Sequence, residues 1–97
     1  METNIKRKRR YLDLNKLLGR RLAQIRHESG VKQEEVADAM DIKRPLVSKI
    51  ENGHRALDAM EIPDYAAAIH VEPDVIFSEI DKIVIEYDSR TGRSAQS

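Results

Sequence analysis

Three short segments with helical hydrophobic spacing, separated by very short breaks, constrain the fold of this chain most. The first, over residues 12–29, repeats apolar side chains at intervals of four, four and three: Leu14, Leu18, Leu22 and Ile25. The second and third, over 32–40 and 44–51, repeat the pattern over fewer turns. Gly30 and Asn52-Gly53 follow the first and third segments, as helix-ending residues do. The sequence therefore predicts short α-helices joined by tight turns.

The remaining residues predict two more helices and one strand. A fourth helix lies within 57–69 and starts near Ile62, because Pro63 would lie too deep in a helix capped at Asp58. Its apolar residues form the expected core face: Met60, Ile62, Tyr65, Ala66 and Ile69. A fifth helix runs from Pro73 to Ile80. The predicted class is all-α, five helices followed by a short C-terminal β-strand and tail.

The predicted strand is the β-branched run over residues 82–87, within a C-terminal segment of 82–97. A lone strand leaves its backbone groups unpaired and is not stable by itself. One interpretation is a disordered tail. The other is antiparallel pairing with the same strand of a second copy, which would make 82–97 a dimerisation segment.

Positive and negative charges occupy opposite halves of the chain, although the net charge is zero. Residues 1–55 hold fourteen Lys or Arg and eight Asp or Glu, whereas residues 56–97 hold three and nine. Five consecutive cations at 6–10 predict a flexible basic arm over residues 1–11, either solvated or in contact with a nucleic acid. A basic half suits a polyanion as partner.

Several classes of protein are disfavoured by composition. The chain has no cysteine, its three histidines fall on separate elements, and no Ser, His and Asp arrangement indicates a catalytic site. No apolar run approaches the roughly 20 residues of a membrane span. We expect a cytoplasmic protein that is not an enzyme and has no metal, cofactor or membrane partner.

The second and third predicted helices form a helix-turn-helix, with residues 44–51 as the recognition helix. A recognition helix needs long polar side chains toward the major groove and apolar ones behind. Val47 and Ile50 supply the apolar side. The expected outward set is Lys43, Arg44, Ser48 and Lys49.

The segment LGRRLAQIRHESGVKQEEVADAMDIKRPLVSKIENG resembles the Cro/C1-type (XRE) helix-turn-helix family. Its marks are a first helix ending in Arg and then Gly, a Gln at the start of helix two, and Ile-Glu-Asn-Gly at the end of the recognition helix. The resemblance extends from about Leu18 to Phe77. It implies a lambda-repressor-like domain over residues 12–81 that binds double-stranded DNA.

The resemblance also implies roles for individual residues. The base-reading positions would be Lys43, Arg44, Pro45 and Lys49, with Ser48 beside them. Phosphate contacts would come from Gln33, Asn52 and the backbone around Arg55, and Arg10 is a further candidate from the basic arm. Arg26 and Glu51 would form a structural ion pair.

Two residues depart from the family pattern. Pro45 stands where a polar reader is common, and its side chain cannot donate a hydrogen bond. Lys43 replaces the usual Ser or Thr cap, and the loss of such a cap removes about 1 kcal/mol of helix stability.

Two functions remain open at this stage. The first is a transcriptional regulator, expected to repress, that binds a pseudo-palindromic operator as a homodimer. The second is an antitoxin or other protein-binding regulator, whose acidic residues 56–97 would bind a partner protein such as a toxin.

Overall fold

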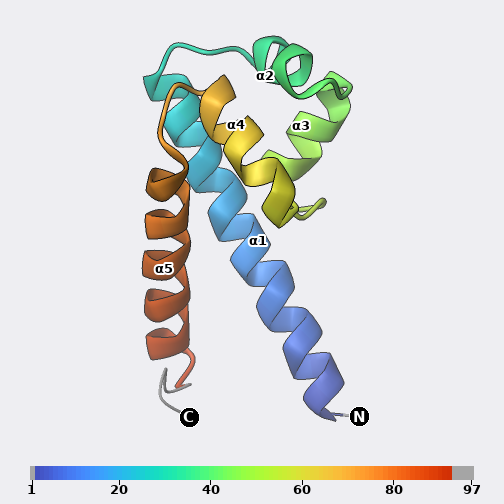
Figure 1. Cartoon of the computed structure of the whole chain (residues 1–97). Coiled ribbons are helices and arrows are strands. Elements are labelled where there is room, and N and C mark those ends of the chain that lie inside the picture. The colour runs from blue at the N-terminus through green and yellow to red at the C-terminus, as the bar shows by residue number, and fades with distance from the viewer. Residues whose placement is uncertain (1, 93–97) are drawn as a thin grey trace.

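The computed structural model describes residues 2–92, and every regular element in that range is helical (Figure 1). Five α-helices and one short 3₁₀ helix follow each other along the chain: α1 (Glu2–Glu28), α2 (Gln33–Met40), α3 (Arg44–Glu51), η1 (Ala59–Glu61), α4 (Ile62–Ala68) and α5 (Pro73–Arg90). The predicted all-α class and the number of helices are confirmed.

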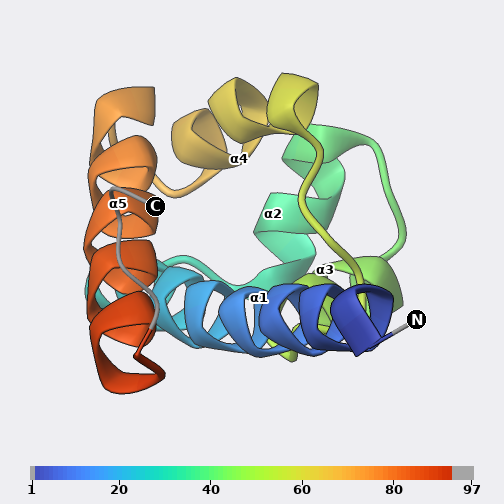
Figure 2. The same ribbon diagram turned by 90° about the horizontal axis from the view of Figure 1, so that it is seen from below.

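The five α-helices surround the core, and their contacts with one another form a ring. α1 is the longest element and crosses the molecule diagonally, with α5 beside it and α2, α3 and α4 around its C-terminal half (Figure 1). α1 contacts α3 and α5, α2 contacts α3 and α4, and α4 contacts α5. Seen from below, α1 therefore closes one side of a ring whose other sides are the remaining helices (Figure 2).

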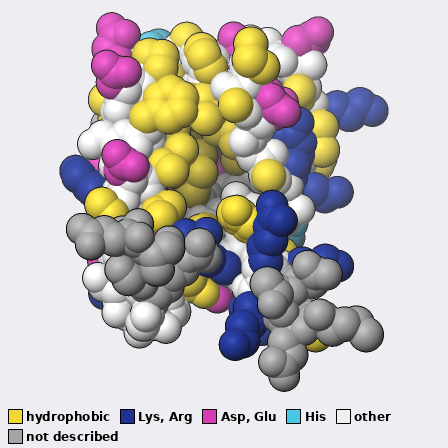
Figure 3. All heavy atoms as spheres, turned by 60° about the horizontal axis from the view of Figure 1, so that its bottom comes forward, with side chains coloured by type: hydrophobic (Ala, Val, Ile, Leu, Met, Phe, Trp, Pro, Cys, Tyr) yellow, Lys and Arg dark blue, Asp and Glu magenta, His cyan; other side chains and the backbone are white. Residues whose placement is uncertain are grey.

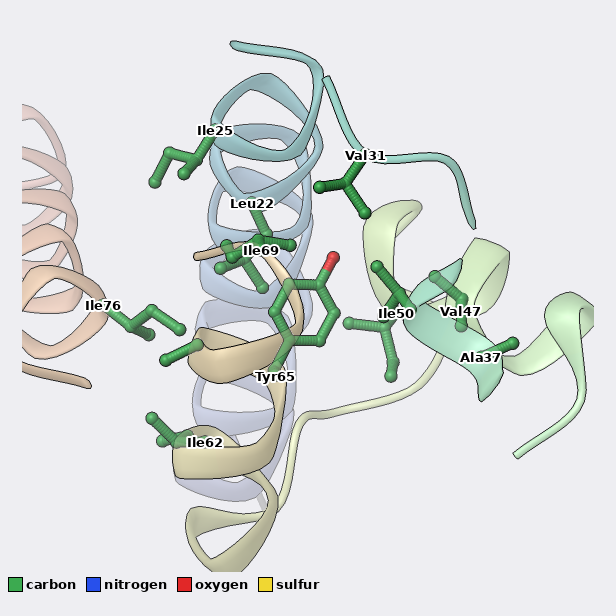
Figure 4. Close-up of a cluster of buried hydrophobic side chains, with 12 residues drawn as sticks. Leu22, Ile25, Val31, Ala37, Val47, Ile50, Ile62, Tyr65, Ile69 and Ile76 are labelled. Carbon is green, nitrogen blue, oxygen red and sulfur yellow. The ribbon is translucent and has the colours of Figure 1, made fainter. Parts of the chain in front are cut away.

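The core is aliphatic with one central tyrosine, as Figure 4 shows. Every α-helix contributes to it: Leu22, Ile25, Val31, Val36, Ala37, Val47, Ile50, Ile62, Tyr65, Ala66, Ile69 and Ile76. The Tyr65 side chain is fully buried, and its hydroxyl donates to Glu51 Oε2 at 2.9 Å. Burial of apolar area at roughly 25 cal/mol per Å² makes this cluster the main source of stability.

The helix ends follow the local signals in the sequence. Gly30 adopts a φ of 72° and ends α1, and Gly53 adopts a φ of 78° just after α3. Asp41 adopts a φ of 55° between α2 and α3, so a non-glycine residue makes the tight turn of the motif. Both glycine predictions are confirmed.

The start of the fourth helix resolves the conflict between Asp58 and Pro63. Asp58 Oδ1 accepts from the Met60 N–H at 2.8 Å, so the Asp58 cap belongs to η1. α4 then begins at Ile62, which places Pro63 in its first turn, as predicted. Met60 does not join the core as expected, because the 3₁₀ turn directs it outward and leaves it 81% exposed.

The predicted strand over residues 82–87 is wrong, because these residues continue α5 to Arg90. Ile76, Ile80, Ile83 and Tyr87 recur at intervals of four, three and four, and none of these side chains is exposed. Packing on this helical face outweighs the β preference of the branched residues. Tyr87 also donates to Asp13 Oδ2 of α1 at 2.6 Å. Residues 93–97 of the predicted tail lie outside the described residues.

The basic segment also differs from the expected arm, because α1 begins at Glu2. Two contacts support the helix: Arg9 pairs with Asp13 one turn later at 3.7 Å, and Arg7 lies over the Tyr11 ring at 5.5 Å. Arg10 connects the segment to α5 through Asp88. Residue 1 lies outside the described range.

Candidate nucleic-acid interface

The two sides of α3 differ sharply in burial. Val47 is fully buried and Ile50 is 2% exposed, so they hold the helix against the core. Lys43, Arg44 and Lys49 are exposed on the outside. An amphipathic helix of eight residues is therefore held rigidly with its cationic side toward solvent.

The first turn of α3 contains the two residues that depart from the family pattern. Lys43 is the N-cap residue, and its side chain makes no capping hydrogen bond. Pro45 lies in the first turn, where its missing N–H leaves no intrahelical bond unmade. Pro45 is exposed and Ser48 is half-buried, so none of the five predicted base-reading residues is buried.

A buried ion pair fixes α3 to α1. Arg26 donates to Glu51 from Nε at 2.6 Å and from Nη2 at 3.0 Å. Arg26 also donates from Nη1 to the Val31 carbonyl at 2.9 Å. Gln33 donates to Glu51 Oε1 at 2.9 Å, and Tyr65 donates to Oε2. One carboxylate thus joins α1, α2, α3 and α4.

The ionisation of this network follows from its contacts. Burial raises the pKa of the Glu51 carboxyl, but hydrogen bonds from Arg26, Gln33 and Tyr65 outweigh burial and leave the pKa below its ordinary value. Burial together with the Glu51 charge raises the pKa of Tyr65 far above its ordinary value. Glu51 is therefore charged and Tyr65 neutral at physiological pH.

Gln33 lies between this network and the recognition helix. Its amide nitrogen donates to Glu51, and its amide oxygen accepts from Arg44 Nη1 at 3.1 Å. Arg44 also lies 3.7 Å from a carboxylate oxygen of Glu34. A predicted phosphate-binding residue and a predicted base-reading residue are thus in direct contact, at the N-terminus of α2.

Asn52 and Arg55 follow α3 in the loop that leads to η1. Asn52 is exposed, and its amide donates to Ser48 Oγ at 3.4 Å. Arg55 donates twice to Glu61, from Nη1 at 3.1 Å and from Nη2 at 2.7 Å. These bonds lower the pKa of Glu61. The Arg55 side chain therefore stabilises the loop.

The structure places Arg10 against α5 and away from the other predicted site residues. Its guanidinium donates to Asp88 Oδ1 at 3.0 Å and to Oδ2 at 2.9 Å, and its side chain is only 17% exposed. This two-bond geometry fits a carboxylate and occupies the guanidinium. The observed contacts of Arg10 are those of a bridge between two helices.

Two glycines bring the end of α3 into backbone contact with α1. A Cβ on Gly19 would lie 2.4 Å from the Ile50 carbonyl oxygen, and one on Gly53 would lie 2.6 Å from the Lys16 Cα. This contact places Lys16 and Arg20 of α1 beside Asn52, which the sequence reasoning missed. The available signal was Gly19, because a glycine inside a helix indicates a close approach.

On the face that Figure 3 shows, positively and negatively charged side chains lie in different regions. Figure 3 shows most Lys and Arg side chains on the right, and most Asp and Glu side chains along the upper edge. In Figure 1, α3 and the N-terminal half of α1 both lie on the right side. Among the described helices, none combines the length and apolar character needed to cross a membrane.

Comparison with known families identifies one matching model. Residues 17–76 match the model of a family described as a helix-turn-helix domain. The match covers α2, α3, η1 and α4 completely, together with residues 17–28 of α1 and 73–76 of α5. No curated protein matches the chain at a significant level.

Three solved structures share the fold. The restriction-modification controller protein C.AhdI from Aeromonas hydrophila is 33% identical, with a TM-score of 0.59 over 66% of this chain and 96% of that one. An XRE-family like protein from Pseudomonas syringae pv. tomato str. DC3000 is 28% identical, with a TM-score of 0.64 over 84% and 95%. The clp gene regulator ClgR from C. glutamicum is similar in fold, at 22% identity and a TM-score of 0.64 over 71% and 90%.

Proposed function

The chain belongs to the Cro/C1-type (XRE) helix-turn-helix family of DNA-binding transcription regulators, and on this premise we propose that it binds a pseudo-palindromic operator as a homodimer through α3. The single observation that carries the proposal is the contrast across α3. Val47 and Ile50 are buried and pack α3 against the core, whereas Lys43, Arg44 and Lys49 lie on its exposed side. A rigid helix with an outward set of cations suits insertion into the major groove.

Within α3, Arg44 and Lys49 are the proposed readers of guanine, since both side chains can donate to O6 and N7. Pro45 would supply an apolar contact to a thymine methyl group. Arg44 contacts Gln33 and Glu34 in the free protein through exposed, weak interactions. DNA would replace these contacts with charge-assisted bonds to a base.

The proposed phosphate contacts lie on either side of the readers. Gln33 is at the N-terminus of α2, where the first N–H groups have no partner within the helix and the helix dipole favours an anion. Asn52 is exposed just after α3. Arg55 would act through its backbone, because its side chain is bonded to Glu61.

Two copies are proposed because a two-fold dimer places two recognition helices about 34 Å apart, one helical turn of DNA. The surface that supports an interface is on α5, where Phe77 is 49% exposed and Ile85 is 58% exposed. Figure 3 shows hydrophobic side chains gathered in the upper part of that view. Repression is the proposed outcome, since a bound dimer needs only to occupy its site.

Selecting bound sequences from random duplex DNA tests the proposed function. We expect two half-sites in inverted orientation, with centres about 10 base pairs apart. Enrichment of single, unpaired half-sites would contradict the dimer, and enrichment of no sequence would contradict specific binding.

The proposed dimer is tested separately by the change Phe77→Glu, with sedimentation equilibrium as the measurement. A charge in a buried apolar interface should shift the chain to monomer at micromolar concentration. The matched control is Leu12→Glu, on an exposed leucine of α1 outside this surface, which should leave the dimer intact. The opposite pattern would place the interface on α1.

A further inference from the structure

A groove beside the recognition helix contains two cations to which no role has been given. The groove has a volume of about 430 Å³ and lies between α1, the N-terminus of α2 and the C-terminal end of α3. Its lining includes Gln33 and Asn52, and also Lys16 and Arg20 of α1. Lys16 lies one residue before the family match begins. The groove therefore extends the predicted interface onto α1.

The groove carries an excess of positive charge. Glu51 also lines it, but both oxygens of its carboxylate already accept hydrogen bonds, and Arg26 balances its charge. Lys16 and Arg20 thus contribute two further positive charges. The lining is more polar than apolar in character, as expected for a surface that meets an ionic ligand.

Most of the described arginines pair with a carboxylate, whereas Lys16 and Arg20 are in none of the ion pairs among the described residues. Five arginines pair with carboxylates of another element: Arg10, Arg21, Arg26, Arg44 and Arg55. Among the residues that the structure describes, neither Lys16 nor Arg20 is in an ion pair, and both are exposed. Their charges are therefore available to an external anion.

The position of these cations is fixed by the backbone. They are four residues apart on α1, so they share one side of the helix. Gly19 and Gly53 hold the end of α3 against this stretch of α1, with no room for a Cβ at either position. Lys16 and Arg20 are thus fixed relative to Asn52 and to α3 before any ligand binds.

We propose that Lys16 and Arg20 bind a backbone phosphate of DNA, together with Gln33 and Asn52. The inference rests on the proposed function, because it places a duplex on α3. When a recognition helix lies in the major groove, the elements beside it lie over the phosphates that border the groove. Lys and Arg donate only, so their preferred partner here is an anion. A phosphodiester on the strand next to α3 is such an anion.

The test is the double variant Lys16→Gln and Arg20→Gln in the full chain, with binding to the selected operator and to a scrambled duplex measured over a range of salt concentrations. Glutamine keeps a good helix former at both exposed positions. We expect both duplexes to bind roughly ten-fold more weakly and the salt slope to fall by about 0.9 for each bound protomer, because the loss of one phosphate contact removes about 0.9. The preference for the operator should not change.

The matched control is Lys82→Gln with Arg90→Gln, which removes the same charge from exposed positions on α5, a helix that does not line the groove. The control should bind as the unaltered chain does. The variant Arg20→Lys, with Lys16 unchanged, should keep the salt slope of the unaltered chain, because the positive charge remains. An unchanged slope in the groove variant, or an equal loss in the control, would overturn the proposal. Absence of any sequence preference in the unaltered chain would instead reject the proposed function, and the slopes on scrambled DNA would still test the groove.

Discussion

The family-matched residues 17–76 and the two helical extensions outside them are stabilised in different ways. The matched region has a continuous apolar core and a buried Arg26–Glu51 pair. The extensions, residues 2–16 of α1 and 77–90 of α5, are partly packed and are also joined by polar contacts, in which Arg10 binds Asp88 and Tyr87 binds Asp13. The family model thus matches the chain where burial dominates, and the bonds of Arg10 and Tyr87 join two helices outside the match.

The comparison shows why the same chain was predictable in one region and unpredictable in the other. In the matched region, the signals for each helix lie within a few residues of it. In the extensions, the apolar residues of α5 do repeat at helical spacing, but the polar contacts that join α1 to α5 link residues 74 to 78 positions apart. No periodicity within a short window reveals such a contact.

The largest expected effect on stability is the loss of the ion pair in the matched region, which we compare with the loss of an ion pair between the extensions. Glu51→Ala leaves Arg26 buried without its carboxylate, and we expect a loss of about 3–5 kcal/mol in the free energy of unfolding. Arg10→Ala removes a pair whose arginine is partly exposed, and we expect a loss of about 1–2 kcal/mol. Urea denaturation followed by circular dichroism measures both. Equal losses would remove the distinction between the regions.

In the candidate site, too, the features with local sequence signals were predictable, and those that depend on contacts between distant residues were not. The outward set on α3 follows from local spacing, and the Arg26–Glu51 contact follows from the resemblance. In the structure Lys43, Arg44 and Lys49 are exposed, and Arg26 bonds to Glu51. The groove residue Lys16 was missed, because its place beside Asn52 depends on a backbone contact between α1 and α3. The contact between Arg10 and Asp88 could not be predicted either, because the two residues are 78 positions apart in the sequence.

Glycine substitutions offer a second and smaller contrast. Gly19→Ala, in the matched region, forces a methyl group against the Ile50 carbonyl, and we expect a loss of about 1–3 kcal/mol. Gly92→Ala, in the turn after α5, meets nothing within 4 Å and adds only the strain of a φ of 82°. We expect about 1 kcal/mol or less there. Thermal unfolding of both variants gives the ranking, and a greater loss for Gly92→Ala would refute it.

The dependence of stability on pH gives the smallest effect. At Glu51, burial raises the carboxyl pKa, but hydrogen bonds lower it by more. At Glu79, the hydrogen bond from Arg21 lowers the carboxyl pKa. The pKa of each carboxyl therefore lies below its ordinary value. Each carboxylate therefore stabilises the fold fully above its unfolded pKa, about 4.3. That stability is lost as the pH falls through the folded pKa.

The glutamine variants at these positions measure the two contributions. Glu51→Gln and Glu79→Gln should each reduce the loss of unfolding free energy between pH 6 and pH 3. The change should be greater for Glu51, because it is more buried and accepts more hydrogen bonds. A steeper dependence on pH in either variant would contradict the assigned direction of the pKa shift.

The central claim is that the exposed side of α3 reads DNA sequence, and one measurement tests it most directly. Affinity for the selected operator and for a scrambled duplex is compared between the unaltered chain and the double variant Arg44→Ala and Lys49→Ala. Each bidentate base contact contributes about 1–3 kcal/mol of discrimination, so we expect the operator preference to fall by roughly 30-fold or more while the helical content is unchanged. A preserved preference in the folded variant would contradict the assignment of α3 as the recognition helix.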